Sequence, residues 1–232
     1  MNWPEFWEQS RIFDTFMSTS TKVFANRASI VLQIDANSIV LDIGCGPGYL
    51  EEYWLPRVKK IVAADTSRRY VQICRQKFNT DEQVKVFALA KDRFTDFTFL
   101  GEERFTHIIF LSVLQYYPDL DHVKQSVLQA SRYLLPGGKI LLADLPDKST
   151  LFADMGSFLL TAWRGRFLIR ALGLLWRCRF SSYHQTRQNT RVLDFDRQTM
   201  DDLFADTGAC LTWLEEPLTT NPARQNLLIQ LP

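Results

Sequence analysis

Glycine and cysteine are both scarce in this chain of 232 residues, which contains 10 glycines and 4 widely separated cysteines. No two cysteines form a CxxC pair, so neither a structural zinc site nor a disulfide framework is indicated, and we expect no metal. Long apolar runs are missing as well, since none reaches the roughly 20 residues that a membrane-spanning helix needs. The first residues also lack the basic and apolar regions of a secretory signal. These absences predict a cytoplasmic protein.

A large excess of charge is absent too. The 27 basic and 26 acidic residues give a net charge of +1, which excludes a generally basic nucleic-acid coat and an acidic tail. The distribution is nevertheless uneven, because residues 155–193 contain seven arginines and no acidic residue. The remainder of the chain is therefore net negative, and the basic segment needs an explanation of its own.

Apolar runs bounded by turn residues predict five strands along the middle of the chain and two weaker ones near its end. In order they are Ser38–Ile43, Lys60–Ala64, Val84–Leu89, Thr106–Leu111, Lys139–Ala143, Leu211–Leu214 and Asn226–Gln230. Helical spacing lies between them, as at Ser67–Phe78 and Asp121–Leu135, where Pro136 and two glycines then predict a helix stop and a tight turn. This alternation predicts an α/β fold with a Rossmann-like, doubly wound sheet of seven strands. Most strands should be parallel, with one antiparallel strand near the C-terminus.

Two regions fall outside this alternation. Residues 1–37 predict an N-terminal segment of two helices, and residues 147–193 predict a helical insertion after the fifth strand. The core domain then consists of residues 38–146 and 194–232.

The first predicted strand ends in a glycine-rich run, Asp42-Ile43-Gly44-Cys45-Gly46-Pro47-Gly48. A glycine-rich turn between a strand and a helix lets the backbone approach a ligand closely. A dinucleotide fingerprint would need glycine at its sixth position, where this chain has Tyr49. The carboxylate of Asp42 would repel a pyrophosphate and attract a cation such as an ammonium or a sulfonium group. Asp65 ends the second strand, where a carboxylate can accept hydrogen bonds from both hydroxyls of a ribose.

Taken together, these segments resemble the class I S-adenosylmethionine (SAM) dependent methyltransferases, of the type that acts on small molecules. The resemblance rests on VLDIGCGPG at 40–48, VAADTS at 62–67, FLSVLQYYPD at 110–119 and LLPGGKILLAD at 134–144. It implies SAM as the cofactor and S-adenosylhomocysteine as its product. It places the glycine loop beneath the methionine part of SAM, with Asp42 at the amino-acid end and Asp65 on the ribose. The alternative is a Rossmann-like domain that binds another nucleotide.

The resemblance also implies a set of cofactor-binding residues. After the third strand the family places an acid or polar group near the adenine amine, and we favour Asp92 over Lys91, with Phe94 as an adenine wall. Asp92 is equally compatible with capping a turn, and Phe94 with the core. The full predicted set is Asp42, Gly44, Cys45, Gly46, Gly48, Asp65, Thr66, Asp92, Ser112 and Gln115.

Methyl transfer from a sulfonium is a direct displacement on an activated donor, so the protein mainly supplies position and a dry cavity. A base matters only where the acceptor carries a proton with a high pKa. Tyr116 occupies the place where many family members have a histidine, and it either orients the acceptor or packs on the methionine end. Of the three histidines, His184 is the candidate base, while His107 is expected to be structural and His122 to lie on the surface.

The basic insertion contains a predicted helix over Ser157–Phe180, whose apolar arc is wider than a packed surface helix needs. We favour a lid over the acceptor pocket, in which Trp163, Arg166 and Arg170 bind the substrate. Binding to an anionic membrane surface, docking of an acidic carrier protein and a homodimer contact are the alternatives. Nucleic-acid binding is disfavoured, because the rest of the chain is acidic and shows no recognised nucleic-acid module.

These observations predict a SAM-dependent methyltransferase that acts on a small acceptor with an apolar or aromatic body and an acidic group, as in biosynthesis. O-methylation is slightly favoured over N- or C-methylation. The alternatives are methylation of a lipid or of an acyl group bound to a carrier protein, in the membrane case by a peripheral protein, and a non-catalytic SAM-binding partner protein.

Overall fold

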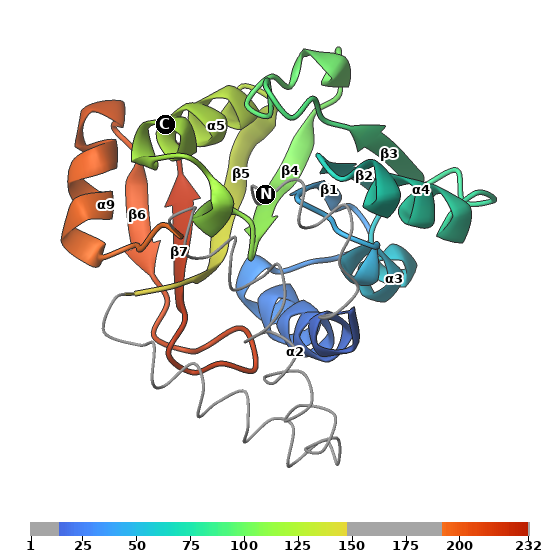
Figure 1. Cartoon of the computed structure of the whole chain (residues 1–232), viewed down its shortest axis with the longest axis horizontal. Helices are drawn as coiled ribbons and strands as arrows, with labels where there is room; N and C mark the ends of the chain where they lie inside the picture. Colours follow the sequence, from blue (N-terminus) through green and yellow to red (C-terminus); the bar gives the residue numbers. More distant parts are fainter. Residues whose placement is uncertain (1–13, 148–191, 232) are drawn as a thin grey trace, which may run out of the picture.

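The computed structural model describes residues 14–147 and 192–231, which form a seven-stranded sheet covered by helices (Figure 1). The strand order is β3-β2-β1-β4-β5-β7-β6, and β7 runs antiparallel to both of its neighbours. The strands are β1 Ile39–Ile43, β2 Lys60–Asp65, β3 Val84–Ala88, β4 Phe105–Leu111, β5 Leu134–Leu145, β6 Cys210–Trp213 and β7 Gln225–Gln230. This order and the single antiparallel strand confirm the predicted α/β, doubly wound fold.

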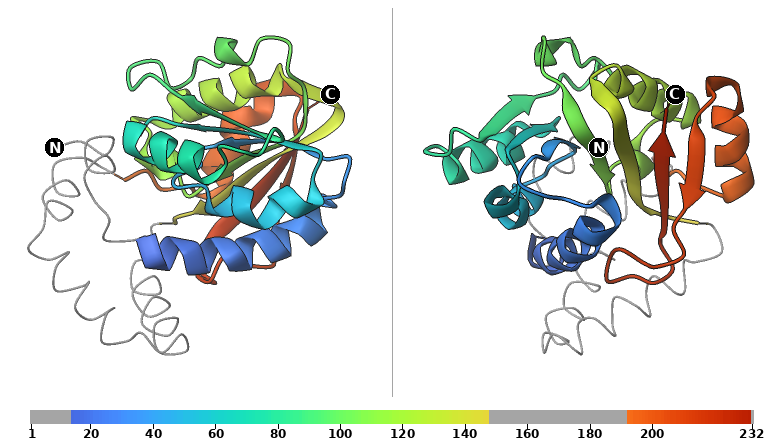
Figure 2. Two further views of the ribbon diagram at one scale, coloured as in Figure 1. Left: turned by 90° about the vertical axis from the view of Figure 1, so that its right-hand side faces the viewer. Right: turned by 180° about the vertical axis from the view of Figure 1, so that it is seen from behind.

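The helices lie on both faces of the sheet, and Figure 2 shows α2 and α3 on one side and α5 on the other. The α-helices are α2 Asp14–Leu32, α3 Tyr49–Trp54, α4 Arg68–Lys77, α5 Leu120–Ser131 and α9 Arg197–Phe204. Short 3-10 turns are η1 Leu55–Arg57, η2 Thr98–Leu100, η3 Leu114–Tyr116 and η5 Ala205–Thr207. No helix within these described ranges is long and apolar enough to cross a membrane.

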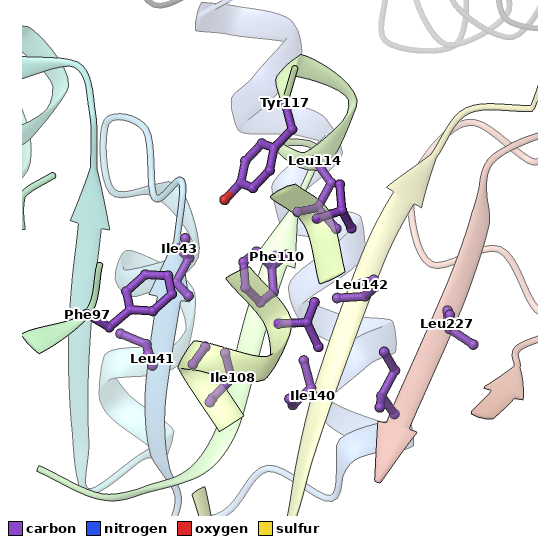
Figure 3. Close-up of a cluster of buried hydrophobic side chains, with 14 of the residues drawn as sticks. Leu41, Ile43, Phe97, Ile108, Phe110, Leu114, Tyr117, Ile140, Leu142 and Leu227 are labelled. Atoms are coloured by element: carbon purple, nitrogen blue, oxygen red, sulfur yellow. The ribbon is translucent and has the colours of Figure 1, made fainter. Parts of the chain in front are cut away.

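Alternation along the strands sorts the core into two layers, because successive side chains of a strand point to opposite faces. Leu41 of β1 and Ile108 of β4 pack toward α5 and α9, in the cluster that Figure 3 shows. Val40 and Ile109 point the other way, toward Trp54 of α3 and its neighbours on α2. Both faces of the central strands are therefore buried, which explains their nearly continuous apolar sequence.

Polar side chains set where several helices begin. Ser67 accepts a hydrogen bond from the backbone N–H of Tyr70 at 3.3 Å, and α4 starts directly after it. Asp119 caps α5 in the same way through His122 N at 2.9 Å. These caps satisfy backbone donors that have no partner within the helix.

Two expectations about element boundaries need correction or completion. The helix predicted over Asp121–Leu135 ends at Ser131, and the Pro136-Gly137-Gly138 run lies inside β5 instead of forming a stop and a turn. The reason is a bulge: Phe105 pairs with Leu134 but His107 pairs with Lys139, so the residues between bulge out of the ladder while the strand continues. Of the two helices predicted in residues 1–37, α2 is described, and residues 1–13 lie outside the described part of the chain.

Candidate functional site

The glycine loop between β1 and α3 has a backbone that only glycine adopts readily. Gly44, Gly46 and Gly48 have φ angles of +85°, +55° and +78°. A Cβ atom on Gly44 would lie 2.6 Å from Val113 Cγ2, and one on Gly48 would lie 2.8 Å from Cys74 Sγ. The loop is thus pressed between the segment after β4 and helix α4, where no larger residue fits. It forms a narrow turn at the carboxyl edge of the sheet, the edge where ligands bind in such folds.

Asp65 fastens this loop to the end of β2. Its Oδ2 accepts a hydrogen bond from Gly46 N at 2.9 Å, and its Oδ1 accepts one from Ser67 N at 2.7 Å. Gly44 N also donates to Ala64 O at 2.7 Å. A carboxylate offers about four acceptor sites, so one carboxylate can accept hydrogen bonds from several donors at once. Thr66, also predicted for the cofactor, follows directly and is half-buried.

Asp42 lies deeper than the sequence indicates. Its side chain is 2% exposed and comes from within β1, where its backbone is flanked by Ala63 on one side and Ile109 on the other. It faces Glu51 of α3, which is completely buried. Burial raises the pKa of Asp42 well above its ordinary value, and the nearby charge of Glu51 raises it further. Burial likewise raises the pKa of Glu51 to about 7.

Glu51 is a site residue that sequence reasoning missed. The signal that could have found it is its position on a helix turn between Leu50 and Trp54, two residues that pack into the core. An acidic side chain on the apolar side of a helix, three residues after a ligand-binding loop, is a candidate for function because burial of an unpaired charge is costly.

A second polar cluster lies at the ends of β4 and β5. Ser112 and Asp144 have φ angles of +53° and +63°, a conformation that residues other than glycine adopt rarely. The hydroxyl of Ser112 donates to Asp144 Oδ2 at 2.5 Å, and that of Thr219 donates to Asp144 Oδ1 at 3.0 Å. Asp144 N donates to the buried Asn226 side chain at 3.1 Å. Sequence reasoning missed Asp144, whose only signal is its place directly after a strand in a family-like motif.

The segment after β4 joins this cluster to the glycine loop. Gln115 Nε2 donates to Ser112 O at 2.9 Å, while Gln115 Oε1 is buried and accepts no hydrogen bond from the described residues. Val113, in the same segment, presses against Gly44. Tyr116 is half-buried in η3, next to Gln115. The structure therefore brings Ser112 and Gln115 to the edge where the loop lies.

The residues predicted to contact the adenine lie in the loop after β3. Asp92 is exposed in the loop after β3, while Leu89 N at the start of that loop donates to Asp65 O at 2.9 Å. Phe94 packs edge-on against Tyr117, with ring centroids 4.8 Å apart. Tyr117 belongs to the buried core, and burial raises its pKa to about 12. Phe94 thus borders the core, and the contact of Asp92 or Phe94 with an adenine stays a prediction.

The structure describes two of the three histidines. His107 is buried at the far end of β4, and its Nε2 lies 3.0 Å from Leu32 O; burial lowers its pKa. His122 is half-exposed, with Nδ1 2.7 Å from Asp119 Oδ1. His184 and the three residues predicted to bind substrate, Trp163, Arg166 and Arg170, lie outside the described ranges. Within those ranges no cluster of three or more acidic, histidine or cysteine residues has the arrangement of a metal site.

Comparison with known proteins agrees with this geometry. Residues 40–138 match the family described as a methyltransferase domain. A stretch of 117 residues, which is 49% of the chain, is 34% identical to a segment of the chondramide synthase of Chondromyces crocatus. That segment makes up 3% of the synthase. A stretch of 121 residues, which is 51% of the chain, is 28% identical to a segment of the ubiquinone biosynthesis O-methyltransferase of Alkalilimnicola ehrlichii. That segment makes up 47% of the relative. The chain thus spans less than half the length of these curated relatives.

Solved structures extend the likeness to nearly the whole chain. DesVI of Streptomyces venezuelae has a TM-score of 0.65 at 14% identity, covering 95% of this chain and 97% of that one. SAM-bound CalS10, an amino pentose methyltransferase from Micromonospora echinaspora, has a TM-score of 0.58 at 13% identity, covering 98% and 94%. At such identities the likeness shows the fold. The chain therefore contains a methyltransferase domain over residues 40–138, within a fold that it shares with SAM-dependent methyltransferases.

Proposed function

We propose that this chain transfers the methyl group of SAM to a small-molecule acceptor. The observation that carries the proposal is the loop of three left-handed glycines, which follows Asp42 at the carboxyl edge of the sheet and is hydrogen-bonded to Asp65. In this proposal Asp65 accepts hydrogen bonds from the ribose, and Asp42 faces the cationic methionine end. Bound SAM supplies an activated methyl group, so the remaining task of the chain is to position the acceptor and exclude water.

The first test concerns Asp65. Replacing Asp65 by alanine should weaken SAM binding by about 1–3 kcal/mol, roughly five- to hundredfold, because a buried ribose and the Gly46 amide both lose an acceptor. Isothermal titration calorimetry with SAM and S-adenosylhomocysteine measures the change. Glu82→Ala is the control, since Glu82 is exposed beyond the opposite end of β3. Unchanged affinity in Asp65→Ala would remove the ribose assignment.

The cluster of Ser112, Asp144 and Thr219 is proposed to face the acceptor, with Ser112, which is also predicted to bind the cofactor, at the border between the two. Each carboxylate oxygen of Asp144 accepts one hydroxyl hydrogen bond, which leaves capacity for an O–H or N–H donor on an acceptor. This supports a hydroxyl- or amine-bearing acceptor, with O-methylation still slightly favoured. Gln115 and Tyr116 are proposed to orient the acceptor or the cofactor from the neighbouring segment.

The roles of the insertion remain proposals from the sequence. In the lid proposal, Trp163, Arg166 and Arg170 bind an acidic, partly aromatic acceptor and His184 is the base. Acid-bearing acceptors should then turn over faster than their methyl esters, and equal turnover of both would contradict an arginine role. From the sequence we also propose that the chain is divided into residues 1–37, a core and an insertion at 147–193. A cytoplasmic location is proposed on the same grounds.

The second candidate function is methylation of a lipid or of an acyl group on a carrier protein. It is favoured by one observation, the seven arginines and no acidic residue in 155–193. Sedimentation with anionic vesicles tests the membrane version, which fails if the protein stays in the supernatant. A non-catalytic SAM-binding role would require SAM binding without turnover of any acceptor in a broad panel.

A further inference from the structure

Two carboxyl groups are buried together beneath the glycine loop. Asp42 of β1 is 2% exposed and Glu51 of α3 is 0% exposed. Asp42 Oδ1 and both carboxyl oxygens of Glu51 accept no hydrogen bond from an N–H or O–H group of the described residues. The two groups are near enough to hydrogen-bond each other once one of them carries a proton. A proton between them is therefore the partner that these oxygens otherwise lack.

The surroundings offer the pair no direct counter-ion. The titratable groups that face it are Asp65 at the end of β2, Cys45 of the loop, and Cys74 and Lys77 of α4. From helix α2, the apolar residues Phe24 and Ala25 pack in the same cluster as Trp54 of α3.

Lys77 is the positively charged residue among these groups, and its Nζ contacts residues other than Asp42 and Glu51. It lies 3.0 Å from Glu52 Oε2, 3.4 Å from Gly48 O and 4.8 Å from the centre of the Tyr49 ring. No lysine or arginine of the described residues is therefore paired with the two buried acids.

We propose that Asp42 and Glu51 share a proton, that Glu51 positions Asp42 for the ammonium group of SAM, and that binding of this cation fixes the pair in its singly protonated, negatively charged form. This inference rests on the proposed function, because SAM is the ligand. Two ionised carboxylates side by side would repel, and two protonated ones would give a cation nothing to neutralise. One shared proton leaves a single negative charge, which matches one ammonium.

The raised pKa values of the pair predict how SAM binding depends on pH. The pKa of Asp42 is raised well above its ordinary value and that of Glu51 to about 7. Glu51 then ionises near neutrality, and the proton that remains on the pair is shared with Asp42. Below pH 7, SAM must displace a proton from Glu51, so SAM affinity should rise as the pH rises from 5.5 to 7.5.

The experiment is calorimetric titration of the full chain with SAM across that pH range, in buffers of different ionisation enthalpy that report the protons released. The wild type should bind roughly twentyfold more tightly at pH 7.5 than at pH 5.5 and release protons at the lower pH. Glu51→Gln should bind more weakly at pH 7.5, with an affinity that hardly changes with pH and no linked release. The titration of SAM itself is common to both proteins and cancels between them.

Two controls separate the pair from its neighbours. Glu52→Gln changes the adjacent exposed acid, which pairs with Lys77, and should keep the wild-type pH dependence. 5′-Methylthioadenosine lacks the amino-acid end, so its affinity should not vary with pH. A wild type that binds SAM with pH-independent affinity overturns the inference and leaves the proposed function standing, and so does wild-type pH dependence in Glu51→Gln. No binding of SAM at any pH overturns the proposed function instead. If Glu51→Gln does not fold, the proton count of the wild type decides alone.

Discussion

At the scale of single residues, the site concentrates backbone conformations that side chains usually avoid. Ser112 and Asp144 both adopt positive φ angles at the ends of neighbouring strands, and their side chains are hydrogen-bonded to each other. Such strain costs on the order of 1 kcal/mol or more for each residue and persists only where surrounding contacts impose it. Here the hydroxyl of Thr219 and the amide of Asn226 supply those contacts from the β6–β7 side of the sheet. The arrangement points a shared carboxylate toward the edge that carries the glycine loop.

Replacing Asp144 by asparagine tests this cluster. The amide retains one acceptor oxygen for two hydroxyl donors, so we expect the free energy of unfolding to fall by about 1 kcal/mol. SAM affinity should change less than twofold, because the cluster belongs to the acceptor end. Urea denaturation and calorimetry measure the two quantities. A large loss of SAM affinity at unchanged stability would move Asp144 to the cofactor end.

At the scale of elements, the path of the glycine loop is set by two neighbouring segments that press against it. A side chain at Gly48 would meet both Cys74 and Phe78 of the α4 region, and one at Gly44 would meet Val113. The path of the loop is therefore set by close packing as well as by backbone freedom. The turn is ready-made before a ligand arrives, which lowers the entropy lost on binding.

Alanine substitutions separate these two contributions. Gly48→Ala should lower the free energy of unfolding by about 2–4 kcal/mol, from the positive φ together with a contact of 2.8 Å to Cys74. Gly101→Ala is the matched control, because Gly101 has a φ of +57° and nothing within 4 Å of its Cβ position. It should lose only about 1 kcal/mol. Equal losses in the two variants, measured by chemical denaturation, would show that packing against α4 is unimportant.

Sequence patterns predict the strands and the cofactor loop well, because both follow from local rules. The buried runs of β1 and β4 are covered on both faces, and the glycine spacing reflects backbone angles within five residues. The end of α5 was predicted wrongly because a pairing with distant Phe105, and not the proline, decides where β5 begins. Glu51 and Asp144 were missed for the same physical reason. Their importance comes from contacts with Asp42 and Thr219, which only the folded chain brings near.

At the scale of the whole molecule, the buried acid pair links the stability of the fold to pH. The pKa of Glu51 rises from 4.5 in a free chain to about 7 when folded. The folded state therefore binds this proton more tightly, and the associated stability is present below pH 4.5 and lost as the pH rises through 7. His107 acts in the opposite direction, because burial lowers its pKa and stability is lost as the pH falls below 6.5. Both effects contribute to the stability of the wild type across pH 5–8.

Comparison of the wild type with Glu51→Gln separates the effect of Glu51 on stability from that of His107. His107 contributes equally to both proteins, so the difference in free energy of unfolding between them isolates Glu51. We expect Glu51→Gln to gain stability relative to the wild type as the pH rises from 5 to 8, by at most about 3 kcal/mol from the shift of its pKa. Urea denaturation at pH 5, 6, 7 and 8 measures that difference. A constant difference across these values would mean that Glu51 does not titrate there in the folded chain, and a falling one would mean that the folded chain stabilises its ionised form.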